Sequence, residues 1–385
     1  MSRLDGILSL HDFEEVARRH LPRSVMAFVQ SGVEAEIALR DNRAVFDDWH
    51  IVPRVLVGVD KRSQAATVFG HDYASPFGVA PMGMESLVGY RSDLVLAAEA
   101  HRANIPFILS GASLIRMEDI IAAHPGAWFQ AYLPLEFART EGLMDRAAAC
   151  GYRTLVVTVD MTAGSNRENT RRAGFHAPIR PGPRMVWEGI THPAWTFGTF
   201  LRTILTHGMP HFENIDAGRG APIVSSNAIR DTSGRAGHDW DVFRAIRRHW
   251  KGNLVIKGLL DPGDARIAAE AGADGIIVST HGGRQMDGVL PALSALPAMV
   301  AAAPGATVMI DSGFRRGTDI LKAFALGAKF VFVGRPFNYA AILGAEGVRH
   351  AFGLLRAEVS RDLGNLGANS LAEVTRDRLV ARRER

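Results

Sequence analysis

The sequence has little cysteine and no long apolar stretch. Cys150 is the only cysteine among 385 residues, so no disulfide can form within the chain, which is typical of proteins from a reducing compartment. No run approaches the roughly 20 apolar residues of a membrane-spanning helix, and residues 1–5 are not followed by the apolar segment of a signal peptide. We therefore expect a cytoplasmic protein without a spanning helix.

Strong charge and the common nucleotide-binding motifs are also absent. The net charge is +4, and the densest basic run, residues 376–385, is interpreted as a solvated end. Nucleic-acid binding is not expected, and neither is a metal site. No G-x-G-x-x-G follows the first apolar run, and no G-x-x-x-x-G-K-[ST] occurs, so the usual dinucleotide and P-loop signatures are excluded.

What the sequence does have is an alternation of short apolar runs and helix-like segments. Residues 1 to about 50 are predicted to be helical, with helices at 9–20, capped by Ser9, and after Pro22. Eight β-branched, apolar runs follow, at 77–82, 106–109, 128–133, 155–160, 254–257, 275–279, 307–311 and 330–333. Eight strands with intervening helices predict a single (βα)8 barrel over 1–385, with an open doubly wound sheet as the alternative.

One interval interrupts this alternation. More than ninety residues separate residues 160 and 254, far more than an ordinary βα connection, and a long loop insertion is predicted at about 176–235. Its middle carries several large apolar residues, among them Trp187, Trp195 and Phe197. This segment suits either an interfacial membrane anchor or a lid or subunit contact.

Residues 279–287, S-T-H-G-G-R-Q-M-D, combine groups that could act on a small organic acid. His281 can take up a proton near neutral pH, and Arg284 can hold a carboxylate through two hydrogen bonds. A surface turn with a solvated arginine is the alternative. The strand ends favour a shared site, because nearly all are polar or glycine and a barrel places its active site there. These ends are Pro81, Met82, Gly83, Ser110, Gln130, Tyr132, Thr158, Asp160, Lys257, Ser279, His281, Asp311, Gly313, Gly334 and Arg335.

The last two strand ends indicate a phosphate site. Glycines and arginines occur together at 311–317 and 333–335, including Arg315 and Arg335, and barrels commonly bind phosphate in the loops after strands seven and eight. Lys257 closes an apolar strand and therefore needs an anionic partner or a role. It could face the electron-rich end of a flavin ring, or it could form a structural ion pair.

Taken together, these residues resemble the FMN-dependent 2-hydroxy-acid-oxidising enzymes, which include glycolate oxidases and lactate and mandelate dehydrogenases. The resemblance covers nearly the whole chain, and H-G-G-R-Q at 281–285 is its most specific motif. Further matching blocks lie at 31–32, 53–56, 80–81, 128–132, 158–160, 166–168, 257–258, 315–319 and 334–336.

The resemblance implies a role for each matching residue. His281 would remove a substrate proton, and Asp160 would stabilise its protonated form. Arg284 and Arg167 would hold the substrate carboxylate, while the hydroxyl of Tyr132 would meet the substrate oxygen. The implied FMN contacts are Pro81, Met82, Gly83, Ser110, Gln130, Thr158, Lys257, Ser279, Asp311, Gly313, Arg315, Gly334 and Arg335.

Five positions depart from the family pattern or distinguish its branches. Phe28 replaces a tyrosine that contacts the substrate carboxylate, so one hydrogen bond is lost and the substrate could be larger and more apolar. Thr280 stands where asparagine is usual, and Ser312 replaces a common glycine. Gly83 is more typical of dehydrogenases than of oxidases, and Ala112 replaces a bulky aromatic, which leaves room for a larger side chain.

The resemblance thus predicts oxidation of an (S)-2-hydroxy acid, with electrons passed to a quinone or another carrier. The alternatives are an oxidase that reduces oxygen to peroxide, an isomerase on a related barrel, and a flavin-binding scaffold without turnover. Residues 185–214 are similar to the loop of membrane-associated bacterial lactate and mandelate dehydrogenases, which implies peripheral contact with the inner face of a membrane. A homotetramer is also expected.

Overall fold

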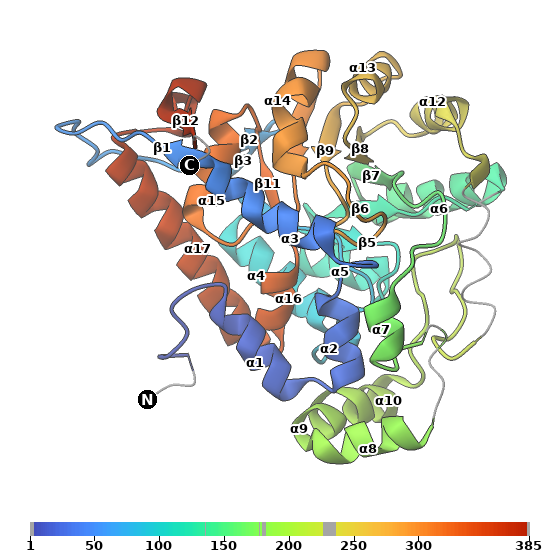
Figure 1. The fold of residues 1–385 in the computed structure, drawn as a ribbon. Coiled ribbons are helices and arrows are strands. Elements are labelled where there is room, and N and C mark those ends of the chain that lie inside the picture. The colour runs from blue at the N-terminus through green and yellow to red at the C-terminus, as the bar shows by residue number, and fades with distance from the viewer. Residues whose placement is uncertain (1–3, 135, 177, 179–181, 226–235, 383–385) are drawn as a thin grey trace.

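Eight parallel strands form the centre of the computed structural model, which describes residues 4–134, 136–176, 178, 182–225 and 236–382 (Figure 1). The sheet has the order β4-β11-β10-β9-β8-β7-β6-β5, and a parallel bridge between Val79 and Phe107 joins its two edges. The closed (βα)8 barrel is therefore confirmed. The strands are β4 (Phe77–Val79), β5 (Ile108–Ser110), β6 (Trp128–Ala131), β7 (Thr154–Thr158), β8 (Asn253–Leu259), β9 (Gly275–Val278), β10 (Thr307–Ile310) and β11 (Val331–Val333).

The barrel interior is packed, not hollow. Alternate strand residues point inward, as the two-residue period of a strand requires, and Trp128, Ile277 and Phe332 are buried in one cluster there. Val68 and Tyr73 belong to the same cluster and come from a hairpin of β2 (Ala66–Val68) and β3 (His71–Tyr73) that precedes the first barrel strand. The packed interior leaves the C-terminal ends of the strands as the place for a ligand.

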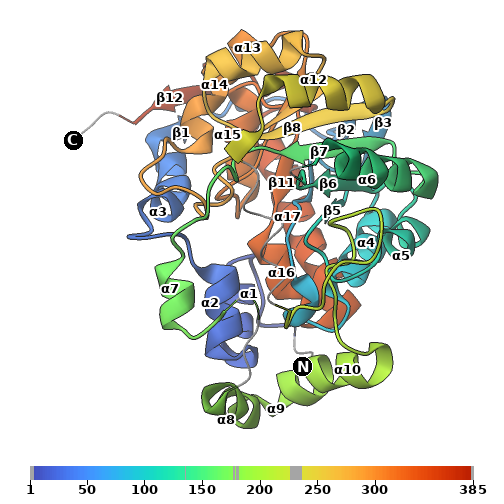
Figure 2. The same cartoon turned by 90° about the vertical axis from the view of Figure 1, so that its right-hand side faces the viewer.

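Helices surround the barrel on its outer side (Figure 2). The intervening helices that the alternation predicts include α4 (Ser92–Ala103), α5 (Met117–Ala123), α6 (Phe137–Cys150), α12 (Trp240–His249), α13 (Pro262–Glu270) and α15 (Gly317–Ala325). Helices α14 (Ala292–Ala302), α16 (Arg335–Ala341) and α17 (Gly344–Leu366) are also present. Pro297 lies inside α14, which weakens the sequence signal for a helix there.

The N-terminal segment is helical as predicted, with α1 (Asp12–His20), α2 (Arg23–Gln30) and α3 (Ile37–Ala44). The expected Ser9 cap is wrong, because the helix begins later and the Asp12 carboxylate instead accepts from the backbone N–H groups of Leu8 and Ser9, both at 2.8 Å. That carboxylate satisfies donors that would otherwise be left free ahead of the first helical turn.

The C-terminal basic run, predicted to be solvated, is only partly so: Arg376 and Arg382 are exposed, but the segment is paired and Arg378 is buried, while residues 383–385 lie outside the described residues. β12 (Leu379–Ala381) pairs antiparallel with β1 (Trp49–Ile51), and the guanidinium carbon of Arg376 lies 4.6 Å from the centroid of the Trp49 ring. The prediction counted charges and did not recognise that arginine stems cover apolar surface.

The long interval after β7 contains helices, where a loop was predicted. α7 (Glu168–Arg172) is followed by α8 (Pro183–Thr191), α9 (Pro193–Trp195), a π-helical turn (η3, Thr196–Leu201) and α10 (Arg202–His207). Helices α8 to α10 project beyond the barrel beside α2 (Figures 1 and 2). In the part of the chain that the structure describes, no helix is long and apolar enough to cross a membrane.

Candidate active site

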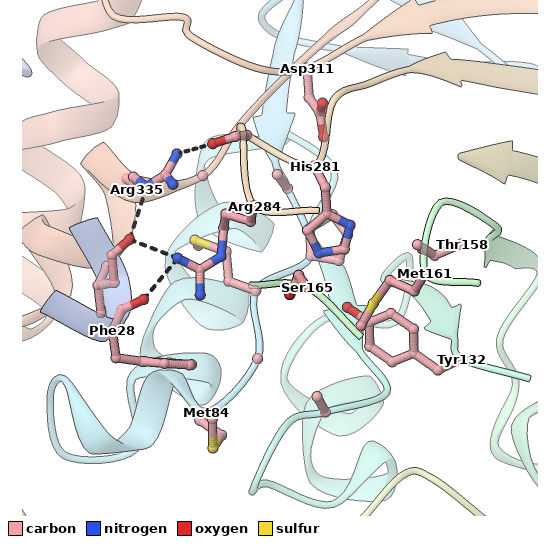
Figure 3. A pocket seen from close by; sticks show the side chains of 18 of the residues that line it. Phe28, Met84, Tyr132, Thr158, Met161, Ser165, His281, Arg284, Asp311 and Arg335 are labelled. Carbon is pink, nitrogen blue, oxygen red and sulfur yellow. Dashed lines mark hydrogen bonds between the residues drawn. The ribbon is translucent and has the colours of Figure 1, made fainter. Parts of the chain in front are cut away.

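A cavity of about 520 Å³ opens at the C-terminal ends of the strands. Figure 3 shows side chains from the N-terminal helices, from several strand ends and from the 279–287 loop turned toward the same space. The residues therefore meet where the strand-end pattern predicts a shared site.

Most of the predicted site residues line this cavity. These are Phe28, Pro81, Met82, Gly83, Tyr132, Thr158, Arg167, Lys257, His281, Arg284, Asp311, Gly313, Arg315, Gly334 and Arg335. The remaining four, Asp160, Ser110, Gln130 and Ser279, each bond to a residue at or near the cavity wall. Asp160 pairs with His281, Ser279 accepts from Lys257, and Ser110 donates to Gln130.

His281 and Asp160 form a directed pair. Nδ1 of His281 lies 2.9 Å from Oδ1 of Asp160, which leaves Nε2 as the ring nitrogen available to the cavity. Burial lowers the pKa of His281, and the Asp160 carboxylate only partly opposes this effect. For Asp160 burial acts in the opposite direction, but the neighbouring His281 and Lys257 outweigh it and the pKa is lowered. The pair thus holds a neutral imidazole beside a carboxylate at neutral pH, as a general base requires.

The loop that carries His281 has an unusual backbone. His281 has φ of 55°, and Gly282 and Gly283 also have positive φ. A Cβ on Gly283 would lie 2.7 Å from the backbone nitrogen of Leu39 in α3. Glycine is needed there because only it permits both this conformation and this close approach.

Two arginines face the same cavity from different elements. Nη1 of Arg284 donates to the backbone carbonyls of Phe28 at 2.8 Å and Ser31 at 2.9 Å. Nη2 of Arg167 donates to the side-chain oxygen of Gln285 at 2.9 Å. Burial, together with other guanidinium groups nearby, lowers the pKa of Arg284 well below its ordinary value. Positive charges held this close together favour an anionic ligand.

Lys257 has the anionic partner that its position requires. Its ammonium lies 2.9 Å from Oδ2 of Asp311 and donates to Oγ of Ser279 at 2.7 Å. Burial would lower its pKa, but the carboxylates of Asp311 and Asp160 outweigh burial and raise it. A permanent positive charge therefore stands at the end of β8.

The two arginines predicted at the phosphate site are both held by backbone oxygens. Arg335 donates to Val29 at 2.9 Å and to Gly282 at 3.0 Å, and Arg315 donates to Phe314 at 2.9 Å. Burial lowers the pKa of Arg315 to about 10. Arg335 thus fastens α2 to the His281 loop, a contact that the sequence pattern did not indicate.

Two of the departures from the family pattern contact each other. Oγ1 of Thr280 donates to Oγ of Ser312 at 3.0 Å and accepts from the amide of Asn42 at 2.7 Å. Asn42 was not predicted to be a site residue. Its position in a helix gives no sign that its side chain contacts a loop far away in the sequence. Gly83 and Ala112 are also neighbours, since a Cβ on Gly83 would lie 2.9 Å from that of Ala112.

An apolar side of the cavity was missed as well. Phe28 stacks on Phe175, with ring centroids 4.5 Å apart and planes at 19°. Met84 and Ile223 belong to the same buried cluster as Phe175, and Phe212 packs against it. Phe175, Phe212 and Ile223 come from the interval between β7 and β8. The strand–helix alternation of the barrel does not extend there, so it could not indicate which side chains face the cavity.

Comparisons with known proteins agree with this geometry. The sequence profile of the family described as FMN-dependent dehydrogenase matches residues 17–381. The chain is 35% identical over 376 residues to (S)-mandelate dehydrogenase of Pseudomonas putida, covering 97% of this chain and 94% of that protein. It is 36% identical over 375 residues to L-lactate dehydrogenase of Pectobacterium atrosepticum, covering 96% of both proteins.

Solved structures give the same result. A crystal structure of the monotopic membrane protein (S)-mandelate dehydrogenase superposes with a TM-score of 0.89 at 34% identity, covering 98% of this chain and 100% of that one. A structure of mandelate oxidase with (S)-2-phenylpropionate superposes with a TM-score of 0.80 at 32% identity, covering 97% and 98%. The chain therefore belongs to the FMN-dependent dehydrogenase family, and its cofactor is FMN.

Proposed function

We propose that this enzyme oxidises an (S)-2-hydroxy acid to the 2-oxo acid and passes the electrons to a quinone or another carrier. One observation carries the proposal: the His281–Asp160 pair opens into the same cavity as Arg284 and Arg167. A base and an anion site facing one space suit proton removal from an organic acid. The alternatives of an isomerase or an inactive scaffold would not need this combination.

The cavity fits FMN on its own chemistry. Nε2 of Gln130 is buried and, among the described residues, has no hydrogen-bond partner, while its Oε1 accepts from Ser110 and Gly111. We propose that this free donor and Lys257 face the flavin ring. Gly313, Arg315 and Gly334 would hold the phosphate end. When bound, FMN accepts the two electrons that leave the substrate.

The substrate carboxylate would dock between Arg284 and Arg167, and Tyr132 would hold the oxygen on C2. This places the reacting carbon near Nε2 of His281, which takes up a proton while Nδ1 stays directed at Asp160. The proton comes from C2 in a carbanion route and from the hydroxyl oxygen in a hydride route. In both, the Asp160 carboxylate stabilises the imidazolium that forms.

The apolar side of the cavity supports a substrate with a bulky apolar side chain. Phe28 adds an aromatic face to this wall and no hydroxyl, and its ring lies 5.2 Å from the Arg284 guanidinium carbon. Met84, Phe175 and Ile223 extend the same surface. A phenyl or a branched alkyl group would bury more apolar area here than a methyl group would.

Residues 185–214 support the proposal of a membrane contact. The exposed large apolar residues on α8 are Val186, Trp187 and Ile190, and Phe197 and Leu205 follow on η3 and α10. Exposed apolar residues gathered on one projecting segment commonly mark an interaction surface. A structural relative, the (S)-mandelate dehydrogenase, is itself described as a monotopic membrane protein. The homotetramer stays a prediction.

His281→Ala should abolish substrate oxidation while retaining FMN. We expect anaerobic addition of (S)-mandelate or a longer 2-hydroxy acid to bleach the yellow enzyme, and the variant to bleach at least about 100-fold more slowly, since a positioned base contributes that much or more. The screen should include lactate, glycolate and several longer acids. If the variant bleaches at the wild-type rate, His281 is not the base; if the wild type never bleaches, the proposed function is wrong.

Reoxidation of the bleached enzyme separates a dehydrogenase from an oxidase. We expect slow recovery of the colour in air and fast recovery with a soluble quinone. Fast recovery in air with stoichiometric peroxide would instead establish an oxidase.

Asp160→Asn should shift the pH dependence as well as the rate. His281 must be neutral to act as a base, so activity is lost as the pH falls below its pKa. The Asp160 charge raises that pKa against the effect of burial, so removing it should move the acid limb of kcat/KM to lower pH. The rate on the plateau should fall at least about 100-fold, because the imidazolium loses its stabilising charge. An unmoved limb would show that the pair is not electrostatically coupled.

Phe28→Tyr should improve the use of small 2-hydroxy acids. A hydroxyl there could donate to the substrate carboxylate, and a hydrogen bond to a charged acceptor is worth about 1.5–3 kcal/mol, so the KM for lactate should fall about tenfold. Phe212→Tyr is the matched control, because it adds the same hydroxyl on the wall formed by the insertion. A KM that does not fall in the Phe28 variant would place residue 28 away from the carboxylate.

The membrane contact can be tested by vesicle binding. Replacing Trp187 and Ile190 by glutamate should weaken sedimentation with phosphatidylethanolamine–phosphatidylglycerol vesicles by about tenfold or more, because charge replaces inserted apolar surface. Val55→Glu is the control, since Val55 is even more exposed but lies outside the insertion. Equal vesicle binding by the wild type, the double variant and the Val55 variant would show that this face does not contact the membrane.

A further inference from the structure

A second cavity, of about 410 Å³, lies between the insertion and the barrel. Its walls come from α2, the end of α7, η2 (Glu85–Leu87) and the inner side of α8 to η3. Trp195 and Phe200 form one wall, with rings stacked 5.4 Å apart at 17°. The indole N–H of Trp195 donates to the carbonyl of Leu87 at 2.7 Å, which fixes this wall to the barrel.

The second cavity borders the active site. Phe175 lines both cavities, and on the active-site side its ring stacks on Phe28. A molecule in the second cavity would thus be separated from the active-site cavity by aromatic side chains. A wall of this kind keeps the two ligands from mixing and leaves their sites adjacent, as electron transfer between them requires.

The second cavity also borders the exposed apolar face of the insertion. Met185 and Glu188 line it, whereas Val186, Trp187 and Ile190 on the same helix are exposed, each at 63–65%. Helix α8 therefore has one side toward the cavity and another toward the surroundings. The cavity lies between the proposed membrane face and the active site.

One corner of the second cavity is polar. Ser24 donates to the carboxylate of Glu188, which is buried, and Arg184 pairs with the same carboxylate at 3.5 Å. Arg184 can donate to a carbonyl oxygen, and Glu188 can accept from a hydroxyl. Flat aromatic walls with one polar corner suit a planar ring that carries carbonyl groups.

We propose that this second cavity binds the ring of the quinone that accepts the electrons, a proposal that rests on the proposed function. The hydroxy acid loses two electrons and two protons to give the oxo acid. The quinone gains two electrons and two protons to give the quinol, so the overall reaction balances. Its apolar tail would leave along α8 toward the membrane face. A lipid acyl chain would make no use of the polar corner.

Filling the second cavity should impair the use of quinone alone. Met185→Trp places a large ring in the cavity, whereas Val186→Trp puts the same ring on the outer side of α8. In detergent solution with a short-chain ubiquinone, the Met185 variant should show kcat/KM lowered by about tenfold or more by steric exclusion. Its anaerobic bleaching by hydroxy acid and its reduction of ferricyanide should equal those of the Val186 variant and the wild type.

Unchanged quinone kinetics in a folded Met185 variant would overturn the proposal. Photolabelling of the wild-type holoenzyme with a short-chain azidoquinone gives a readout that needs neither turnover nor a variant. We expect label on peptides from 22–30 and 182–191, and label confined to other peptides would also overturn the proposal. If no hydroxy acid bleaches the wild-type enzyme, the proposed function is refuted. The labelling result would then show by itself whether the second cavity binds a quinone.

Discussion

The attachment of α2 to the barrel by two partly buried arginines is the constraint on which the site depends. Arg284 comes from the loop after β9 and Arg335 is the first residue of α16, and both donate to backbone oxygens at the end of α2 and just beyond it. Buried carbonyls need such donors, and buried guanidinium groups need acceptors. The arginine N–H groups and the carbonyl oxygens of α2 satisfy each other. The N-terminal helices therefore close the C-terminal end of the barrel, and Phe28 becomes part of the cavity wall.

A second contact between the N-terminal helices and the barrel involves two positions that depart from the expected family pattern. Thr280, Ser312 and Asn42 form one hydrogen-bonded group between the His281 loop, the loop after β10 and α3. The sequence resemblance implies an asparagine at 280 and a glycine at 312, whereas in this chain the hydroxyls of Thr280 and Ser312 bond to each other. Gly83 and Ala112 show a steric version of this coupling, because a Cβ at position 83 would lie only 2.9 Å from the Cβ of Ala112. In both pairs, Thr280 with Ser312 and Gly83 with Ala112, the effect of one residue depends on the identity of the other.

The barrel and most of its site could be predicted from the sequence because each strand is a short apolar run ending in a polar residue. His281 and Lys257 stand out for this reason. What could not be predicted depends on contacts between distant segments. Nothing local shows that Arg335 reaches Val29, that Trp195 turns inward while Trp187 turns outward, or that residues 376–382 pack against Trp49. Amphipathic patterns in short helices identify an apolar face but not what it contacts.

The positive charge around the cavity also links substrate binding to the strength of the base. Burial, Lys257 and Arg167 all lower the pKa of His281, and Asp160 raises it. In the absence of substrate, the imidazole is therefore held neutral and ready to accept a proton. A substrate carboxylate placed between Arg167 and Arg284 would offset part of the positive charge, and the pKa of His281 would rise toward that of a stronger base. If the substrate carboxylate docks as proposed, its binding would therefore strengthen the base, whereas an uncharged alcohol in the same cavity would leave the base weak.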